Sequence, residues 1–258
     1  MVSILLPLYI YPQDGSWEPL LAAAAAYSAV DFTVIVNPDS GPGVASLPDE
    51  NYIDALRSLG SYSNVNLLGY IRCGYGDREI DEIDADIATY AGWESEFASL
   101  GDGGATVELQ GVFVDEVPAE MEYVDLMSHI TESVRDAWEN GMYREATVVY
   151  NPGVVIDRMF YEHADSVVAF EDAEAERAVF MSDGLADVDW YNRGKTGAIV
   201  HTYSGTWNDL QELVREVADS GLESLFVTDQ AGGIYNKWPS MWTSLVQLVS
   251  DRAQAETR

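Results

Sequence analysis

Four acidic residues in this sequence stand directly after short apolar runs. Asp115-Glu116 follows QGVFV, Glu171 follows SVVAF, and Asp229 follows ESLFVT. Hydrolysis of a glycosidic bond needs such a set, because one carboxylic acid must protonate the leaving oxygen while a second carboxylate attacks the anomeric carbon or activates water. However, with 44 acidic residues among 258, a carboxylate at the end of some apolar run is also expected by chance.

Each of these acids has a structural alternative. Glu171 is followed by three more acids within five residues, so it could simply begin a solvated acidic face. Asp229 could cap the loop that follows it. Adjacent residues on an extended strand point to opposite sides, so Asp115 and Glu116 can face the same way only if the strand has already ended.

Other residues near the ends of these runs could bind a sugar. Tyrosine rings can stack on sugar rings, although aromatic residues at such positions are just as often part of a core. His201 could donate to a sugar hydroxyl or be an ordinary strand-end histidine. Asn37 opens the turn NPDSGPG, which is more simply a tight connection and has no phosphate-binding lysine. The candidate substrate-binding residues are Tyr9, Tyr11, Asn37, Tyr75, Asn151, His201, Tyr203 and Asp229.

The composition narrows the range of partners. The formal net charge is −31, from 44 acidic and 13 basic residues. Such a surface repels phosphate backbones and anionic membranes, so it favours a neutral or cationic substrate, for example an amino-sugar polysaccharide, over nucleic acid. Solubility, or adaptation to high salt or low pH, explains the acidity equally well.

Several further features of the chain are expected to be absent. No spacing of His, Asp and Glu resembles a metal site, although dispersed strands can assemble one, and we expect no cofactor. No apolar run approaches the roughly 18 residues of a membrane helix. The start of the chain lacks the pattern of a signal peptide, so we expect an intracellular protein, or an extracellular one whose leader was removed. The single cysteine, Cys73, excludes an internal disulfide, and we expect a monomer.

Eight apolar runs alternate with segments of helical periodicity, and these elements must position the candidate residues. Near-continuous apolar runs are typical of parallel strands buried on both faces. We expect strands over residues 3–10, 31–37, 66–71, 110–115, 146–150, 166–170, 197–201 and 223–228. We expect helices over residues 17–28, 51–59, 80–99, 123–139, 210–220 and 238–253, with shorter ones at 157–162 and 187–191.

This alternation predicts an α/β fold, a single closed (β/α)8 barrel of the TIM type. One domain would cover residues 1–258, close to the roughly 250 residues typical of such barrels. The alternative is an open, doubly wound sheet. In a barrel the strand ends converge on one mouth, so acids far apart in sequence would face one another across a bound sugar.

Together these motifs resemble the spherulin-4, or spherulation-specific, family, which is of the glycoside hydrolase family 135 type. The resemblance spans residues 5–229 and implies a (β/α)8 barrel that performs retaining, endo-acting hydrolysis of α-1,4-linked N-acetylgalactosamine in galactosaminogalactan-type polysaccharide. The matching pieces, in the order of the family, are LLPLYIYP, VIVNPDSGPG, LLGYIRCGYGDR, DIATYAGW, GVFVDEVP, VVYNPG, VVAFE and FVTD.

The resemblance also implies catalytic roles for Asp115, Glu116 and Glu171. Asp115 would be the nucleophile, Glu171 the general acid/base, and Glu116 would support one of them. Arg72-Cys73 departs from the small or hydroxylated residues common in the family, and a cation near the mouth could change subsite preference. Two alternatives remain: a non-catalytic carbohydrate-binding or spore-associated protein on the same barrel, and a barrel enzyme of another class that uses a divalent metal.

Overall fold

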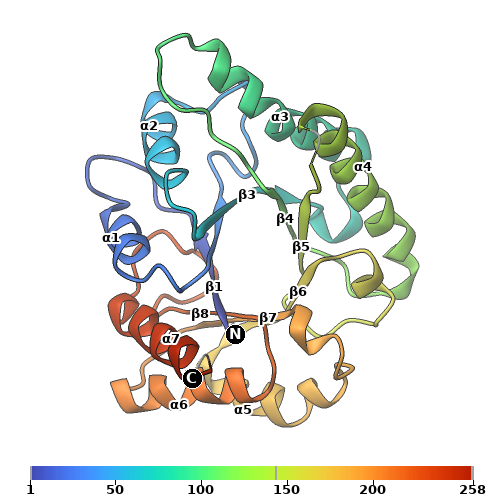
Figure 1. Cartoon of the computed structure of the whole chain (residues 1–258). Helices are drawn as coiled ribbons and strands as arrows, with labels where there is room; N and C mark the ends of the chain where they lie inside the picture. The colour runs from blue at the N-terminus through green and yellow to red at the C-terminus, as the bar shows by residue number, and fades with distance from the viewer. Residues whose placement is uncertain (1, 143, 257–258) are drawn as a thin grey trace.

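The computed structural model describes residues 2–142 and 144–256 and shows a closed barrel of eight parallel strands (Figure 1). The strands follow the order of the chain around the barrel, and the last pairs with the first through Ile4 and Leu225. This closure confirms the (β/α)8 prediction and excludes the open sheet. The strands are β1 (Ser3–Leu8), β2 (Phe32–Val36), β3 (Val65–Arg72), β4 (Gly111–Asp115), β5 (Thr147–Asn151), β6 (Ser166–Ala173), β7 (Thr196–His201) and β8 (Ser224–Val227).

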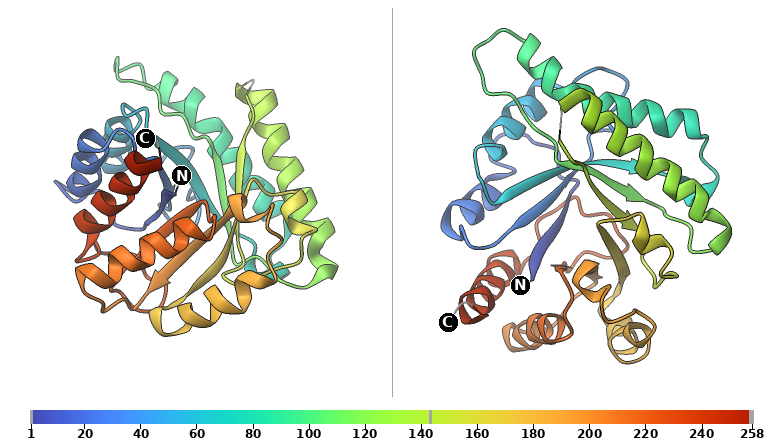
Figure 2. Two further views of the ribbon diagram at one scale, coloured as in Figure 1. Left: turned by 60° about the horizontal axis from the view of Figure 1, so that its bottom comes forward. Right: turned by 45° about the vertical axis from the view of Figure 1, so that its right-hand side comes forward.

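Helices surround the barrel, and α7 closes the ring beside α1 and β1 (Figure 2). The α-helices are α1 (Glu18–Ala26), α2 (Glu50–Leu59), α3 (Ile80–Ser99), α4 (Val124–Met142), α5 (Glu174–Ser182), α6 (Trp207–Asp219) and α7 (Trp242–Glu256). Short 3-10 turns are η1 (Gly74–Gly76), η2 (Met121–Tyr123), η3 (Phe160–Glu162), η4 (Gly184–Ala186) and η5 (Arg193–Lys195). The connection from β5 to β6 contains η3 in place of an α-helix.

Helix α6 illustrates how local sequence produces an outer helix. Thr206 and Asp209 form a capping box, in which each side chain accepts a hydrogen bond from the other residue's backbone N–H. The helix then buries one stripe at i, i+3, i+4 and i+7 spacing, the pattern of a helix with one face on a core. The buried residues of this stripe are Leu210, Leu213, Val214 and Val217.

The segment after β6 differs from the expectation. Residues 187–191 are not helical, and η4 and η5 lie on either side of them. An α-helix not anticipated from the sequence, α5, begins at Glu174. Acidic residues in the first turn of a helix are stabilised by its dipole, so part of the acidic run after Glu171 is the start of α5 rather than an unstructured face.

Strand β6 is also longer than expected and is irregular. It continues to Ala173, and its register against β7 shifts between Val168 and Phe170. The ring of Phe170 stacks on Phe180 of α5, outside the barrel. Because successive residues alternate, the neighbouring Glu171 points inward, and a bulge of this kind commonly re-aims a side chain at a site.

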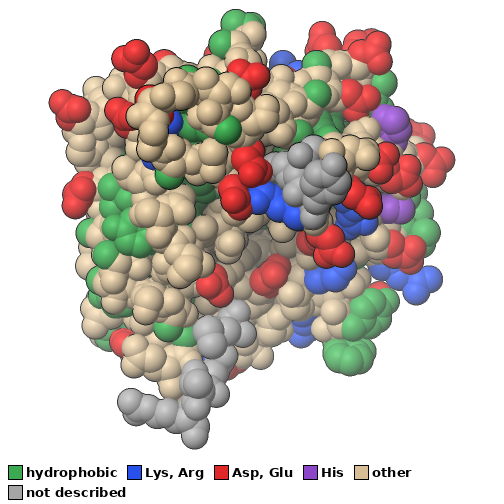
Figure 3. All heavy atoms as spheres, turned by 45° about the horizontal axis from the view of Figure 1, so that its top comes forward, with side chains coloured by type: hydrophobic (Ala, Val, Ile, Leu, Met, Phe, Trp, Pro, Cys, Tyr) green, Lys and Arg blue, Asp and Glu red, His purple; other side chains and the backbone are tan. Residues whose placement is uncertain are grey.

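The outer surface is strongly acidic. Asp and Glu side chains are spread over the face shown in Figure 3, and Lys and Arg are much sparser there. Within the described ranges, no helix combines the length and the apolar character needed to cross a membrane.

Candidate active site

The ends of β4, β5 and β6 bring Asp115, Asn151 and Glu171 together. Asp115 pairs in register with Asn151 across β4 and β5. The preceding residue, Tyr150, points outward and donates a hydrogen bond to the carbonyl of Met127 in α4, so Asn151 faces the barrel interior. Its Nδ2 donates to Asp115 Oδ1 at 2.7 Å and to Glu171 Oε2 at 2.5 Å. The two acceptor oxygens therefore lie within about 5.2 Å of each other, the sum of the two bond lengths.

Two tyrosines complete the hydrogen bonding of these carboxylates. Tyr70, on β3, donates to Asp115 Oδ2 at 2.8 Å, and Tyr235, in the loop after β8, donates to Glu171 Oε1 at 2.5 Å. The ring of Tyr9 lies edge-on between them, with centroids 5.6 Å from Tyr70 and 5.8 Å from Tyr235. Each carboxylate is thus held by one tyrosine and by the shared amide.

Burial raises the pKa of both carboxyl groups above their ordinary values. For Asp115, the hydrogen bonds from Tyr70 and Asn151 oppose this effect. For Glu171, the bonds from Tyr235 and Asn151 oppose it, but the nearby charge of Asp115 raises the pKa further. The two groups form a coupled pair that retains a proton more readily than isolated acids do.

The surrounding phenols remain donors. Burial, followed by the charge of Asp115, holds the pKa of Tyr70 far above its usual value. Burial and the charge of Glu171 do the same for Tyr235. At the pH of most biological media both hydroxyls are protonated and donate to the carboxylates.

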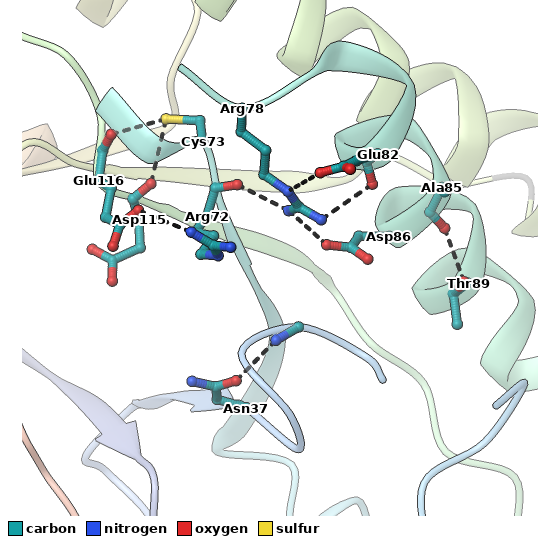
Figure 4. Close-up of polar contacts among 11 residues, drawn as sticks. Asn37, Arg72, Cys73, Arg78, Glu82, Ala85, Asp86, Thr89, Asp115 and Glu116 are labelled. Atoms are coloured by element: carbon teal, nitrogen blue, oxygen red, sulfur yellow. Dashed lines mark hydrogen bonds and ion pairs between the residues drawn. The ribbon is translucent and has the colours of Figure 1, made fainter. Parts of the chain in front are cut away.

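Glu116 occupies a different position from Asp115. Strand β4 ends at Asp115, and Glu116 adopts a left-handed backbone with φ of 57°. Its side chain lies beside Arg72, with Oε2 3.9 Å from Nη1, and its carbonyl accepts from the Cys73 thiol at 3.0 Å (Figure 4). The strand has therefore ended before Glu116, and this acid borders the mouth on the β3 side.

The loop after β3 is anchored to α3. Arg78 donates to the carbonyl of Arg72 at 3.0 Å and pairs with Asp86 at 2.7 Å (Figure 4). The backbone N–H of Tyr75 donates to the carbonyl of Glu116 at 2.7 Å. These contacts hold the aromatic ring of Tyr75, 62% exposed, at the rim above the acids.

Backbone strain is concentrated at the same end of the barrel. A left-handed conformation is unfavourable for residues other than glycine and is retained mainly where structure or function requires it. Within the described ranges, every such residue lies in a loop that follows a strand. They are Ser40, Tyr75, Glu116, Thr202 and Tyr235.

His201 lies near the acid pair. Its Nε2 is 3.9 Å from Asp172 Oδ1, and its Nδ1 is 2.9 Å from the Thr202 hydroxyl. A protonated His201 would lower the pKa of Glu171 and so oppose the effect of burial. The structure therefore assembles Tyr9, Asn151 and His201 around the carboxylates, with Tyr75 at the rim.

Four other predicted substrate-binding residues make hydrogen bonds that organise loops. None of these four bonds involves Asp115, Asn151 or Glu171, so a role in sugar binding stays a prediction. The donor or acceptor partners are Asp49 for Tyr11, Gly41 for Asn37, Thr206 for Tyr203 and Ser240 for Asp229.

Tyr70 and Tyr235 were not identified from the sequence. Tyr70 precedes Arg72 by two residues on β3, so strand alternation places both side chains on one face. Because Arg72 was expected near the mouth, this spacing could have indicated Tyr70 as well. Tyr235 stands in an aperiodic, glycine-containing loop, where no sequence pattern indicates its approach to Glu171. Among the residues that the structure describes, no group of three or more His, Cys, Asp or Glu side chains is arranged to hold a metal ion.

Comparisons with known proteins give a consistent result. The family described as "Spherulation-specific family 4" matches residues 3–249. Spherulin-4 of Physarum polycephalum is 27% identical over 260 residues, which cover 98% of this chain and 70% of that protein.

The solved structures add a close relative and a distant one. The crystal structure of Aspergillus clavatus Sph3 in complex with GalNAc superposes with a TM-score of 0.85 at 32% identity, covering 96% of this chain and 97% of Sph3. A chitinase from Bacteroides thetaiotaomicron has a TM-score of 0.61 at 7% identity, over 100% of this chain and 98% of the chitinase, and shares the fold alone.

Proposed function

The chain belongs to the spherulation-specific family 4, and from this membership and the arrangement of its acids we propose that it is a retaining endo-glycosidase of α-1,4-linked N-acetylgalactosamine polymers of the galactosaminogalactan type. The observation that carries the proposal is the shared amide of Asn151, which keeps the bonded oxygens of Asp115 and Glu171 within about 5.2 Å. Retaining enzymes hold their two carboxyl groups about 5–5.5 Å apart, whereas inverting enzymes need roughly 6.5–9.5 Å to admit water.

The chemistry proceeds in two displacements. Asp115 attacks the anomeric carbon and forms a covalent glycosyl ester, while protonated Glu171 gives its proton to the departing glycosidic oxygen. Glu171, now a carboxylate, then takes a proton from water, and the resulting hydroxide displaces Asp115 from the sugar. Two inversions restore the original anomeric configuration, and both carboxyl groups return to their starting states.

The division of roles follows the family resemblance, because each acid accepts hydrogen bonds from one tyrosine and from Asn151. The resemblance assigns Asp115 as the nucleophile, and the hydrogen bonds that Tyr70 and Asn151 donate stabilise its ionised form. That charge in turn raises the pKa of Glu171. A proton held on Glu171 while Asp115 is ionised would suit a general acid.

An enzyme nucleophile also suits an α-linked substrate. The 2-acetamido oxygen of N-acetylgalactosamine can reach its anomeric carbon only from the α face, where the leaving oxygen already stands. Substrate-assisted hydrolysis, in which that acetamido group replaces the nucleophile, is therefore unavailable, and a retaining reaction on this linkage needs an enzyme carboxylate such as Asp115. The GalNAc bound to Sph3, at 32% identity, supports this sugar class for the site.

Tyrosines on two sides of the acids would bind the sugar. Tyr9, Tyr70 and Tyr235 form a compact aromatic group beside Asp115 and Glu171. The exposed ring of Tyr75 would stack on a neighbouring sugar at the rim.

Incubation with purified galactosaminogalactan, followed by measurement of new reducing ends, tests the proposal. We expect cleavage by the unaltered protein and a fall of about 10²–10⁴-fold in Asp115→Asn and Glu171→Gln. Glu116→Gln, whose side chain borders Arg72, should lose less. Tyr27→Phe removes a phenol at the C-terminal end of α1, away from the strand ends, and serves as a control for a phenol outside the acid pair.

Two outcomes would contradict the proposal. Binding of the polymer without any new reducing ends would favour the non-catalytic carbohydrate-binding alternative. Loss of cleavage in the presence of a chelator would favour the metal-dependent alternative.

A further inference from the structure

Asn151 bonds to both candidate catalytic acids, and its side chain is almost fully buried. The residue is 6% exposed, and its Nδ2 donates one hydrogen to Asp115 Oδ1 and the other to Glu171 Oε2. An amide nitrogen carries two hydrogens, so Nδ2 has no further bond to offer. The nitrogen of this side chain is therefore fully occupied by the two carboxylates.

The other polar atom of the amide is also out of reach of a ligand. Oδ1 is buried and accepts no hydrogen bond from the residues that the structure describes. Most buried polar groups in proteins are paired, so an exception of this kind has to have a cause. The cause lies at the opposite end of the amide. Ionised carboxylates only accept hydrogen bonds, so Nδ2 must face them and Oδ1 must face away.

The strand that carries the amide fixes its position. Asn151 is the last residue of β5 and lies in register with Asp115 of β4. Its carbonyl accepts from the Val117 N–H at 3.1 Å, and the preceding Tyr150 is bonded to the Met127 carbonyl of α4. The amide is thus a rigid reference point, and the positions of the two carboxylates follow from it.

The shared amide acts on the protonation of both acids in the same direction. A donor stabilises the ionised form of a carboxyl group more than the protonated form, so each bond from Nδ2 lowers the pKa of its acceptor. The two tyrosines differ in this respect, because Tyr70 bonds to one acid and Tyr235 to the other. Asn151 therefore influences both ends of the pH range in which one acid is ionised and the other protonated.

We propose that Asn151 is a positioning residue, which holds the carboxylates of Asp115 and Glu171 at the spacing of a retaining pair and contributes to catalysis without binding the sugar. This inference rests on the proposed function. Both polar atoms of the amide are withheld from a ligand, one by its bonds to the acids and the other by burial. Asn151 thus acts on the substrate only through the two carboxylates that it orients.

Asn151→Leu tests this role, because leucine has a similar shape and no hydrogen-bond donor. We expect kcat for a soluble α-1,4-N-acetylgalactosamine oligosaccharide to fall about 10²-fold, as when a reacting group is slightly misplaced, while KM stays within about 2-fold. Loss of one bond to each acid raises both pKa values, so the acid and alkaline limbs of the kcat/KM profile should both move upward by about one pH unit. A raised KM with both limbs unmoved would show that Asn151 binds the sugar and would overturn the proposal.

A second variant and a matched control separate positioning from a purely structural role. Asn151→Asp keeps the size of the side chain and should move both limbs at least as far, because the added carboxyl contributes like charge. Asn64 is also 6% exposed, and its Nδ2 donates to the carbonyls of Ala24 and Val30 where β3 begins, at the end of the barrel away from the acids. Asn64→Ala should lower the midpoint of thermal unfolding and leave both limbs in place.

NMR titration of the side-chain carboxyl carbons measures the same effect without a substrate. Asp115→Asn and Glu171→Gln identify the two resonances, and in Asn151→Leu both pKa values should rise by about one unit. If the unaltered protein cleaves no polymer, this titration still decides whether Asn151 orders the acid pair. A rise of neither pKa, or of one alone, would overturn the proposal.

Discussion

Replacing Tyr235 by Phe removes one hydrogen bond to Glu171 and should shift the pH profile without abolishing activity. A hydrogen bond to a charged group contributes about 1.5–3 kcal/mol and one between neutral groups about 0.5–1.5 kcal/mol. The phenol therefore favours ionised over protonated Glu171 by about 1–1.5 kcal/mol, or about one pKa unit. Since the bond lowers the pKa of Glu171, its loss raises that pKa.

The direction of the shift depends on the role of Glu171. As the general acid, Glu171 must be protonated, so its pKa limits activity on the alkaline side of the kcat/KM profile. Tyr235→Phe should move this alkaline limb upward by about one pH unit. Tyr70→Phe removes the corresponding bond to Asp115, which must be ionised, and should move the acid limb upward by a similar amount.

The assay is kcat/KM for a soluble α-1,4-N-acetylgalactosamine oligosaccharide across the pH range, with Tyr27→Phe as the control. Tyr27 lies at the C-terminal end of α1, away from both catalytic acids, so the profile of this variant should coincide with that of the unaltered protein. An acid-limb shift in Tyr235→Phe and an alkaline-limb shift in Tyr70→Phe would show that the two roles are reversed. If neither limb of the pH profile moves in Tyr235→Phe or in Tyr70→Phe, the tyrosine hydrogen bonds do not set the pKa values of Glu171 and Asp115, and the reasoning is refuted.

Three further outcomes concern stability. Burial raises the pKa of Glu171, so ionisation of this acid destabilises the folded protein. Glu171→Gln should therefore increase the free energy of urea unfolding at neutral pH, and this gain should vanish below the ordinary glutamate pKa of about 4.3. A gain that does not depend on pH would contradict this expectation. Gly76 has φ of 89°, and a Cβ there would lie 2.3 Å from the Tyr123 ring, whereas a Cβ at Gly103 would meet nothing within 4 Å. Gly76→Ala should therefore lower the free energy of unfolding by about 1–3 kcal/mol more than Gly103→Ala. Equal losses in the two variants would refute the packing argument. The net charge of −31 makes the folded protein repel itself, and added salt screens this repulsion. The midpoint of thermal unfolding should therefore rise between 0.01 and 1 M NaCl, a range over which the Debye length shrinks from about 30 to 3 Å. An unchanged midpoint would show that self-repulsion is unimportant.

The barrel could be predicted from the sequence because its strands are buried on both faces. Each appears as a compact apolar run, and eight such runs alternating with helical segments leave few other topologies. Helix α5 escaped prediction because its acidic start, Glu174 to Arg177, resembles a solvated charged segment. The expected helix at 187–191 does not form, and this stretch instead carries the exposed Trp190 and Tyr191 on a turn.

The candidate site was predictable in part. Acids at strand ends identify Asp115 and Glu171, since every strand of a parallel barrel ends at the same mouth. Asn151 could be assigned to that mouth, but its bond to both carboxylates depends on the exact spacing of three strands. Tyr235 reaches Glu171 from a long aperiodic loop, whose path follows from tertiary packing rather than from local pattern.

The retaining mechanism at Asp115 and Glu171 is tested most directly by NMR of the first reducing ends released from an α-1,4-N-acetylgalactosamine oligosaccharide, recorded before the anomers equilibrate. Attack by Asp115 followed by hydrolysis predicts that the α-anomer appears first. Initial release of the β-anomer would mean a single displacement by water and would contradict the account.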